Sequence, residues 1–212
     1  MKSVITAAAA ALVALSAAPS FAATAIYTTA NSTGGNQSYP GTLGLNFDVS
    51  SSVTVTQFGA FDSGKDGITT NINVAIFDRN TGLIISPTVN FLGTANAAGN
   101  AYVFKTVTPF VLAAGNYQLG AWNYNSTDMN FNTFGNNPGP IVFNNLGGNL
   151  TALTAAYSFS SGNLATITDP GLTRYGAGTF AVAVPEPATW GLMIAGFAMT
   201  GFAMRRRAAV VA

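Results

Sequence analysis

One short acidic segment has the residue types of a cation site. Asp62 and Asp66 flank the sequence SGK, and Asp78 closes the next apolar segment. Calcium binds carboxylate and carbonyl oxygens gathered in one loop, so a calcium site at Asp62 and Asp66 is chemically possible. The full calcium-loop pattern is missing, however, and Lys65 places a positive charge inside the cluster. We therefore predict that these aspartates stabilise turns and that the chain holds no metal, with calcium as the alternative.

Catalytic residue types are scarce in this chain. Histidine and cysteine are both absent, which removes the usual general base, the usual transition-metal ligand, thiolate chemistry and disulfides. Glycoside hydrolysis needs two carboxyl groups placed across a sugar, but the single glutamate, Glu186, lies near the C-terminus and the aspartates are scattered. A GxSxG nucleophile motif is missing as well. We predict that the protein is not an enzyme and needs no cofactor, with a secreted hydrolase as the distant alternative.

Aromatic residues offer a different kind of chemistry, because exposed rings stack on sugars. Trp122, Tyr124, Phe131 and Phe134 follow one another closely and are the candidates for such a platform. Alternate aromatic residues on a strand more often fill a hydrophobic core, and we favour that interpretation here. Glycan binding remains the best specific alternative for this region.

The N-terminus has the layout of a secretory signal peptide. Lys2 is followed by an uncharged run rich in Ala, Val and Leu, and small residues stand at Ser20 and Ala22. We predict residues 1–22 as the signal peptide, with signal peptidase cutting between Ala22 and Ala23. Cleavage after Ala25 is the second choice.

The segment between the two ends, residues 23–183, has the size of one domain. Charged residues make up 7% of the whole chain, against about 25% in a typical protein. This segment has a net charge of −2, from Lys65, Arg79, Lys105 and Arg174 against Asp48, Asp62, Asp66, Asp78, Asp128 and Asp169. Because no basic patch exists to neutralise phosphates, we exclude nucleic acid as a partner.

Short stretches of alternating apolar and polar residues recur between turn sequences in this domain. They are SVTVTQFGAF from Ser52, INVAIFD from Ile72, LIISPTVNFL from Leu83, AYVFKTVTPFVL from Ala101 and NYQLGAWNY from Asn116. This period predicts strands with one buried face, and the regular spacing predicts an all-β domain, an antiparallel β-sandwich of jelly-roll-like type. Residues 123–149, rich in Asn and Gly, are expected to form a long, loosely structured connection, with a binding loop as the alternative.

The last 29 residues, 184–212, form the third segment of the chain. Pro185 and Pro187 lack a backbone N–H and keep the residues before them out of helical geometry, so the segment around Glu186 is predicted to be extended and accessible. Residues 188–204 are uncharged and would span about 25 Å as a helix, near the lower limit for a bilayer core. Trp190 suits the outer interface.

Three consecutive arginines follow this apolar stretch. Arg205, Arg206 and Arg207 are expected to hold that end in the cytoplasm. We therefore predict a single transmembrane sorting helix. A plain membrane anchor is the alternative, but an anchor would not need the two prolines.

This tail resembles the PEP-CTERM sorting signal, in the variant with Trp three positions after the second proline. The matching elements are Pro185, Glu186, Pro187, Trp190 and the arginine cluster, while Gly191 stands where many variants have Ala. The resemblance implies that an exosortase of a Gram-negative bacterium recognises and processes the chain. It implies export through the inner membrane, a transient membrane-anchored stage, and a final place at the cell surface or in the extracellular matrix.

Residues 53–122 also resemble a β-sandwich module of exported bacterial proteins with the same type of tail, and this likeness bears on the fold. Together the resemblances imply a noncatalytic surface or matrix protein associated with exopolysaccharide or biofilm. A carbohydrate-binding module is the first alternative.

Overall fold

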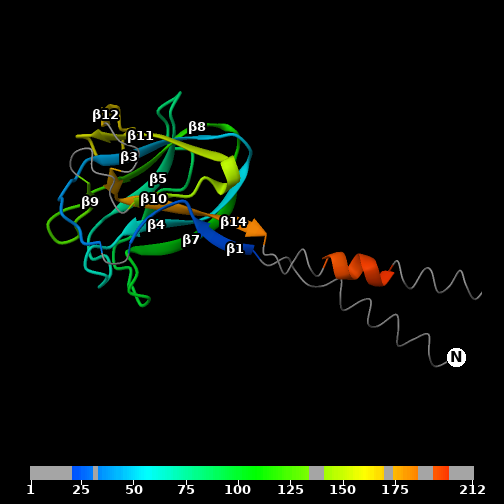
Figure 1. The fold of residues 1–212 in the computed structure, drawn as a ribbon. Coiled ribbons are helices and arrows are strands. Elements are labelled where there is room, and N and C mark those ends of the chain that lie inside the picture. Colours follow the sequence, from blue (N-terminus) through cyan, green and yellow to red (C-terminus); the bar gives the residue numbers. More distant parts are fainter. Residues whose placement is uncertain (1–20, 31–32, 134–140, 170–173, 186–192, 201–212) are drawn as a thin grey trace, which may run out of the picture. The chain divides into compact units, whose positions relative to one another are not determined.

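The computed structural model describes residues 21–30, 33–133, 141–169, 174–185 and 193–200 of the 212-residue chain (Figure 1). The chain divides into two compact units. One is Ala23–Ala183, and the other comprises the terminal stretches 1–22 and 184–212. Strands are the main regular elements of the first unit, and the predictions for residues 1–20 and 201–212 lie outside the described residues.

Two main sheets make up the β-domain (Figure 1). The four-stranded sheet has the order β1 (Phe21–Ala25), β14 (Gly178–Pro185), β4 (Val53–Phe61) and β7 (Tyr102–Leu112). The six-stranded sheet has the order β12 (Ile167–Asp169), β11 (Leu150–Ser158), β3 (Thr42–Val49), β8 (Gly115–Trp122), β5 (Asn73–Asp78) and β6 (Val89–Asn90). The long strands alternate between the two sheets along most of the chain, so the sheets cannot separate into independent halves.

Smaller elements complete the described structure. Two strand pairs join β2 (Tyr27–Thr29) to β10 (Ile141–Phe143) and β9 (Phe131–Asn132) to β13 (Tyr175–Gly176). A single 3₁₀ turn, η1 (Leu146–Gly148), leads into β11, and residues 193–200 are α-helical. The pairing is antiparallel in both small sheets and along the ladders of the large ones. The predicted antiparallel all-β class is therefore confirmed for the described residues.

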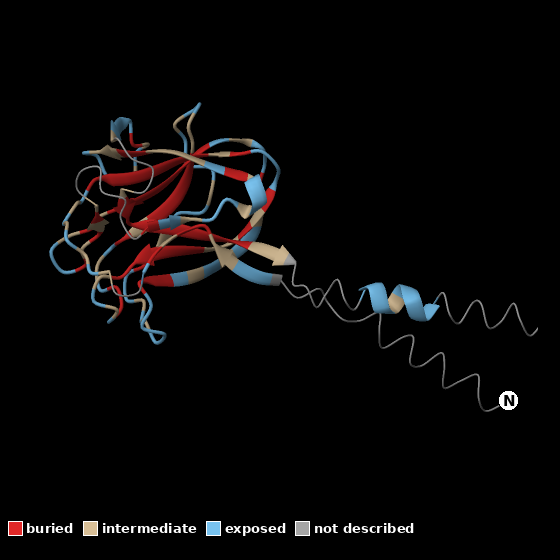
Figure 2. Cartoon of the chain, in the orientation of Figure 1, coloured by how far each residue is buried: buried red, intermediate tan, exposed pale blue. Residues whose placement is uncertain are grey.

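Apolar side chains from both large sheets meet in one core. In β4, Val53 and Val55 are buried while Thr54 and Thr56 are partly exposed, which is the expected period of two. The rings of Phe47 in β3 and Phe180 in β14 lie 5.5 Å apart, so these two strands pack face to face. Figure 2 shows the buried residues concentrated on the strands of the domain.

The opposite face of the six-stranded sheet is also covered, by the segment between β11 and β12. The amide of Gln118, 1% exposed, donates to Asn46 Oδ1 (2.7 Å) and to Ala165 O (2.9 Å), and accepts from Ala165 N (2.7 Å). Leu164 packs against the cluster of Ala75, Phe77 and Trp122. This segment therefore shields a second apolar layer, and Gln118 satisfies the backbone groups that the contact buries.

Four of the five predicted strands are confirmed as β4, β5, β7 and β8. The fifth prediction, a continuous strand from Leu83 to Leu92, is wrong: only β6 and an isolated bridge at Ile84 form there. Pro87 supplies no N–H to a ladder in the middle of this segment. Leu83 and Leu92 are 66% and 56% exposed, so their apolar character does not reflect burial.

Residues 123–149 are more structured than a loose connection. They contain β9, β10 and η1, while residues 134–140 lie outside the described part. Tyr124 is fully buried, and its hydroxyl donates to Ala177 O (2.7 Å) and accepts from Phe61 N (3.1 Å). This tyrosine therefore ties the start of the segment to the ends of β4 and β14.

Candidate functional site

The first candidate site from the sequence, at Asp62 and Asp66, does not gather both carboxylates around one point. Asp62 is 1% exposed and accepts hydrogen bonds from Lys65 N, Gly67 N and Asn96 Nδ2, each at 2.9 Å. Asp66 is exposed. The described residues contain no group of three or more acidic, histidine or cysteine side chains able to hold a metal ion. Asp62 thus has the contacts of a turn-stabilising residue.

Asp128 has a similar structural role in the next loop. Its Oδ2 accepts from Thr69 N (3.2 Å), Thr70 N (2.9 Å) and both threonine hydroxyls (3.2 and 2.6 Å). The residue is 5% exposed. This carboxylate therefore cross-links two loops at one end of the domain.

The alternative of an aromatic platform is not supported at its first two residues, Trp122 and Tyr124. Trp122 is 7% exposed and Tyr124 is fully buried, which confirms the core interpretation for these two residues. Phe131 is partly exposed and Phe134 lies outside the described residues. A sugar cannot stack on rings that the domain itself covers.

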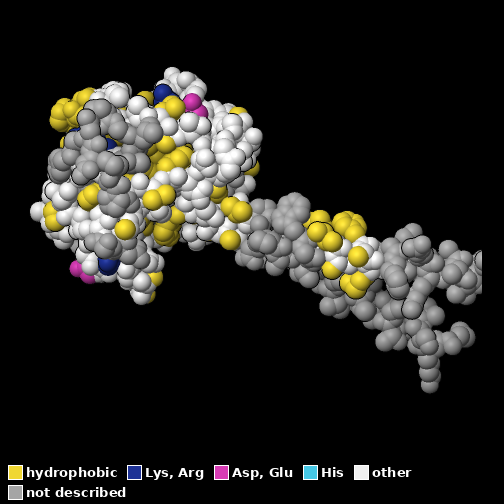
Figure 3. All heavy atoms as spheres, viewed as in Figure 1, with side chains coloured by type: hydrophobic (Ala, Val, Ile, Leu, Met, Phe, Trp, Pro, Cys, Tyr) yellow, Lys and Arg dark blue, Asp and Glu magenta, His cyan; other side chains and the backbone are white. Residues whose placement is uncertain are grey.

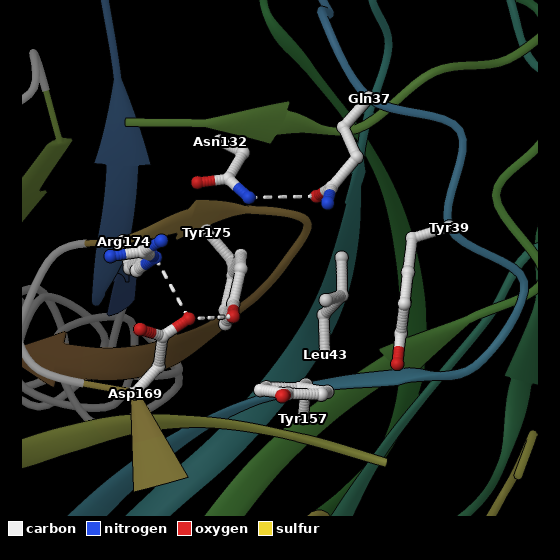
Figure 4. Close-up of a pocket in the computed structure, with 8 residues that line it drawn as sticks. All are labelled: Gln37, Tyr39, Leu43, Asn132, Tyr157, Asp169, Arg174 and Tyr175. Atoms are coloured by element: carbon white, nitrogen blue, oxygen red, sulfur yellow. Dashed lines mark hydrogen bonds and ion pairs between the residues drawn. The ribbon is translucent and has the colours of Figure 1, made fainter. Parts of the chain in front are cut away.

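A pocket elsewhere on the domain collects polar and aromatic side chains (Figure 4). It encloses about 200 Å³, and its lining residues are Gln37, Tyr39, Leu43, Asn132, Tyr157, Asp169, Arg174 and Tyr175. They come from the segment before β3, from β3, β9, β11 and β12, and from Arg174 and Tyr175 at the beginning of β13, where Arg174 directly precedes the strand. We call it the Tyr157 pocket.

An ion pair and a tyrosine form one side of the Tyr157 pocket. Arg174 Nε lies 2.8 Å from Asp169 Oδ2, and the Tyr175 hydroxyl donates to the same oxygen. Burial, followed by the bond to Asp169, raises the pKa of Tyr175 well above its usual value, so this hydroxyl stays protonated. The pair cancels its own charge, and this side of the pocket presents a neutral surface.

Amide groups form the upper edge of the pocket as drawn in Figure 4. Gln37 Oε1 accepts from Asn130 Nδ2 (2.9 Å) and from Asn132 Nδ2 (3.0 Å). The backbone N–H of Asn132 in turn donates to Asn36 Oδ1 (2.7 Å). These contacts hold the Gln37 carbonyl in place and leave its Nε2 with no partner among the described residues. Two N–H groups are therefore available to a ligand.

Three aromatic rings continue from the pocket onto the surface. Tyr39 contacts Tyr157 edge to face, with ring centroids 6.1 Å apart and planes at 87°. Tyr157 contacts Phe159 in the same way, at 5.6 Å and 88°. Phe159 is 77% exposed, the largest exposed fraction among the exposed large apolar residues of the described chain. We call Tyr39, Tyr157 and Phe159 the aromatic row.

Sequence reasoning did not identify this pocket. Its residues are separated by up to 138 positions, because β3, β11, β12 and β13 bring them together only in the folded domain. One local signal was present: Asp169, Arg174 and Tyr175 lie close together in a chain with 7% charged residues.

The predicted processing residues lie at the ends of two strands. Ala22 and Ala23 belong to β1 and are exposed, and Pro185 is the last residue of β14. Strands β1 and β14 are neighbours in the four-stranded sheet, and just beyond β1 Ile26 N donates to Phe180 O (2.9 Å). Glu186, Pro187, Trp190 and Arg205–Arg207 lie outside the described residues.

The predicted transmembrane helix is described only in part. Residues 193–200 are helical, with Met193, Ile194, Phe197 and Met199 exposed. Within the described ranges no helix has the length and apolar character required to cross a membrane.

Comparison with known proteins identifies the C-terminal segment. No curated protein matches the chain. The PEP-CTERM protein-sorting motif, however, matches residues 183–207, which confirms the sorting signal expected from the two prolines, the apolar stretch and the arginines. This motif implies export, processing by an exosortase and sorting to the cell surface. The chain thus carries a PEP-CTERM protein-sorting motif at residues 183–207, and this motif implies an exported protein.

Proposed function

We propose that the β-domain is a noncatalytic component of the cell surface or extracellular matrix, associated with exopolysaccharide or biofilm after its tail has been processed. The observation that carries this proposal is the sorting motif at residues 183–207. A transient stage in the inner membrane, held by residues 188–204 and Arg205–Arg207, belongs to the same proposal. Signal peptidase is the second processing partner, at Ala22 and Ala23.

The contacts of the buried carboxylates support a noncatalytic role. Asp62 and Asp128 accept hydrogen bonds from backbone N–H groups, and Asp169 faces Arg174 and Tyr175. The Tyr157 pocket contains one carboxylate among its lining residues, whereas glycoside hydrolysis requires two across the scissile bond. A secreted hydrolase would instead show turnover that Asp169→Asn abolishes.

The test follows the tail in the native host. Mass spectrometry of the surface-derived protein is expected to find a C-terminus near Pro185–Pro187 and an N-terminus at Ala23. Replacing Pro185, Glu186 and Pro187 with alanine should let a helix continue through the site, so uncleaved chain should accumulate in the inner membrane. Wild-type chains that still end at Ala212 in steady state would contradict processing and favour a plain anchor.

A variant of the three arginines tests membrane retention separately from cleavage. Replacing Arg205, Arg206 and Arg207 with alanine removes the charge that opposes translocation of this end. Part of the population should then leave the membrane with its tail intact. The proline variant therefore reports on cleavage and the arginine variant on retention.

Matrix association has its own readout. In a host strain that makes no exopolysaccharide, the processed protein is expected in the culture medium, with its C-terminus still cut. Equal retention at the surface in both strains would contradict the association and leave processing unaffected.

A further inference from the structure

We infer that the Tyr157 pocket binds one neutral pyranose residue of a polysaccharide, and that Phe159 stacks on a neighbouring residue of the same chain. The inference deepens the proposed function by naming the ligand class of the β-domain, and it rests on that function for the source of the polysaccharide. The site differs from the aromatic residues that the sequence offered as an alternative sugar platform.

The size of the pocket limits the ligand to one small ring. Its volume of about 200 Å³ lies below the range of about 300–1,000 Å³ that holds drug-sized molecules. Tyr157 in the lining is itself partly exposed, and the Phe159 ring that it contacts is 77% exposed. A ligand longer than one ring therefore has an exposed aromatic surface onto which it can continue.

The polar groups of the pocket can form hydrogen bonds with the hydroxyl groups of a sugar. Gln37 Nε2 offers two N–H donors, and the bonds from Asn130 and Asn132 to Gln37 Oε1 fix their direction. The Tyr157 hydroxyl has no hydrogen-bond partner among the described residues and supplies both a donor and an acceptor. Side chains that are already held in place lose little conformational entropy when a ligand binds, which favours recognition.

The aromatic row supplies the apolar half of the contact. A pyranose has faces of C–H groups that pack against the electron-rich face of an aromatic ring. Edge-to-face contacts with Tyr39 and Phe159 hold the Tyr157 ring nearly perpendicular to both neighbours. Leu43, 3% exposed, adds an apolar surface deeper in the pocket.

The charges of the lining residues favour a neutral sugar over a uronate or an amino sugar. Asp169 and Arg174 are the charged residues of the lining, and they lie 2.8 Å apart with both side chains largely buried. A uronate would have to compete with Asp169 for Arg174, and an amino sugar would have to compete with Arg174 for Asp169. Each exchange separates a partly buried ion pair, so a neutral sugar is favoured over either.

The experiment measures binding to the full chain in a zwitterionic detergent, because a sugar-headed detergent would itself compete. The probes are methyl glucoside, methyl galactoside and methyl mannoside, the disaccharides built from them, and glucuronate and glucosamine as charged controls. Titrations followed by amide NMR run to about 50 mM, since single rings of this size bind with millimolar Kd. We expect shifts confined to the pocket residues for at least one neutral sugar, and tighter binding of its disaccharide.

Three variants complete the test. Phe159→Ala should weaken disaccharide binding about five- to tenfold and monosaccharide binding by a smaller factor, because Phe159 contacts Tyr157 but does not itself line the pocket. Gln37→Ala should weaken both. Leu83→Ala, at an apolar residue that is 66% exposed and remote in the sequence, should change neither. Amide spectra of each variant without ligand verify that the fold is intact.

Two results would overturn the inference. One is the absence of shifts with every neutral sugar, and the other is preferential binding of glucuronate or glucosamine. Either result leaves the tail-processing and matrix experiments unchanged, so failure of the sugar site is distinguishable from failure of the proposed function.

Discussion

Individual aspartates of the domain act by accepting backbone hydrogen bonds inside loops. Asp62 orders the turn that contains Lys65, whose φ of 58° is in the left-handed region, and Asp128 bonds two successive N–H groups at Thr69 and Thr70. A non-glycine residue held at positive φ raises the free energy of the folded chain, and neighbouring contacts must offset this cost. In this turn the hydrogen bonds from Lys65 N and Gly67 N to the Asp62 carboxylate offset it.

We predict that chelation leaves the melting temperature unchanged, whereas Asp62→Ala lowers the free energy of unfolding by about 2–4 kcal/mol. The variant leaves Lys65 N and Gly67 N without their acceptor in a buried turn. Thermal unfolding with and without EDTA and calcium measures both effects. Asp66→Ala, at an exposed position, is the matched control and should be nearly neutral. A calcium-dependent rise of several degrees that either variant removes would establish the metal site instead.

At the scale of elements, the six-stranded sheet depends on the segment between β11 and β12 to cover its outer layer. Gln118 makes three hydrogen bonds there, two of them to Ala165. Gly44 lies directly opposite Gly120 in the β3–β8 ladder, and a Cβ at Gly44 would come within 2.6 Å of the Gln118 side chain. The glycine therefore provides the space in which this amide turns toward Ala165.

We predict that Gln118→Ala releases this segment and exposes Trp122. The chain has one other tryptophan, Trp190. In a Trp190→Phe background, the tryptophan fluorescence therefore comes from Trp122 alone. Loss of the Gln118 amide should shift the fluorescence emission of Trp122 to longer wavelength and lower the free energy of unfolding by about 2–4 kcal/mol. Thr151→Ala, an exposed residue of β11, is the control. Unchanged emission in Gln118→Ala would show that packing by Leu164 is sufficient.

Strand β1 links processing to stability. Cleavage between Ala22 and Ala23 keeps most of β1, whereas cleavage after Ala25 removes it and leaves β14 as an unprotected edge. A chain that begins at Ile26 is therefore expected to be about 1–3 kcal/mol less stable than one that begins at Ala23, through the lost ladder bonds. Urea unfolding of the two chains measures the difference. Equal stabilities would show that β1 contributes nothing to the sheet.

At the scale of the whole molecule, packing must stabilise the fold alone, because the chain has no cysteine and few charges. Figure 3 shows only scattered charged side chains on the visible face. Among the buried tyrosines, Tyr27, Tyr102 and Tyr124 have the smallest exposed fractions, at 2%, 4% and 0%. Burial is the main cause that raises the pKa of each of them above its usual value.

We predict cooperative unfolding in alkali. Each buried tyrosine has a higher pKa in the folded than in the unfolded chain, so its contribution is fully present below about pH 10 and is lost as the pH rises toward the folded pKa. Between the unfolded and the folded pKa, the free energy of unfolding falls by about 1.4 kcal/mol per pH unit for each tyrosine. Tyrosinate absorbance and circular dichroism should therefore change together. Ionisation of all the tyrosines near pH 10 with the β spectrum intact would contradict their burial.

The domain itself provides the broadest prediction. Residues 23–183 expressed without either terminal segment are expected to fold as a soluble monomer with a β-dominated circular dichroism spectrum. The division of the chain into compact units at these residues supports this expectation. A mainly helical spectrum, or aggregation that the terminal segments prevent, would contradict it.

Local signals in the sequence were sufficient for the C-terminal sorting motif and for four of the strands. The sorting motif is contiguous, and its prolines, apolar stretch and arginines act through their own chemistry wherever the chain folds. The alternation in β4 and β7 likewise needs no knowledge of neighbours, because a period of two places every second side chain on one face.

Tertiary structure alone decided the remaining features. Strand β3, TLGLNFDV, is buried on both faces, so its pattern does not alternate. Leu83–Ile85 have strand-like residues, but their side chains remain exposed and only an isolated bridge forms at Ile84. The Tyr157 pocket depends on the pairing of β11 with β3 and β12 and of β13 with β9, which are contacts between residues far apart in the chain. Pairing and burial depend on the whole fold, and no local pattern encodes them.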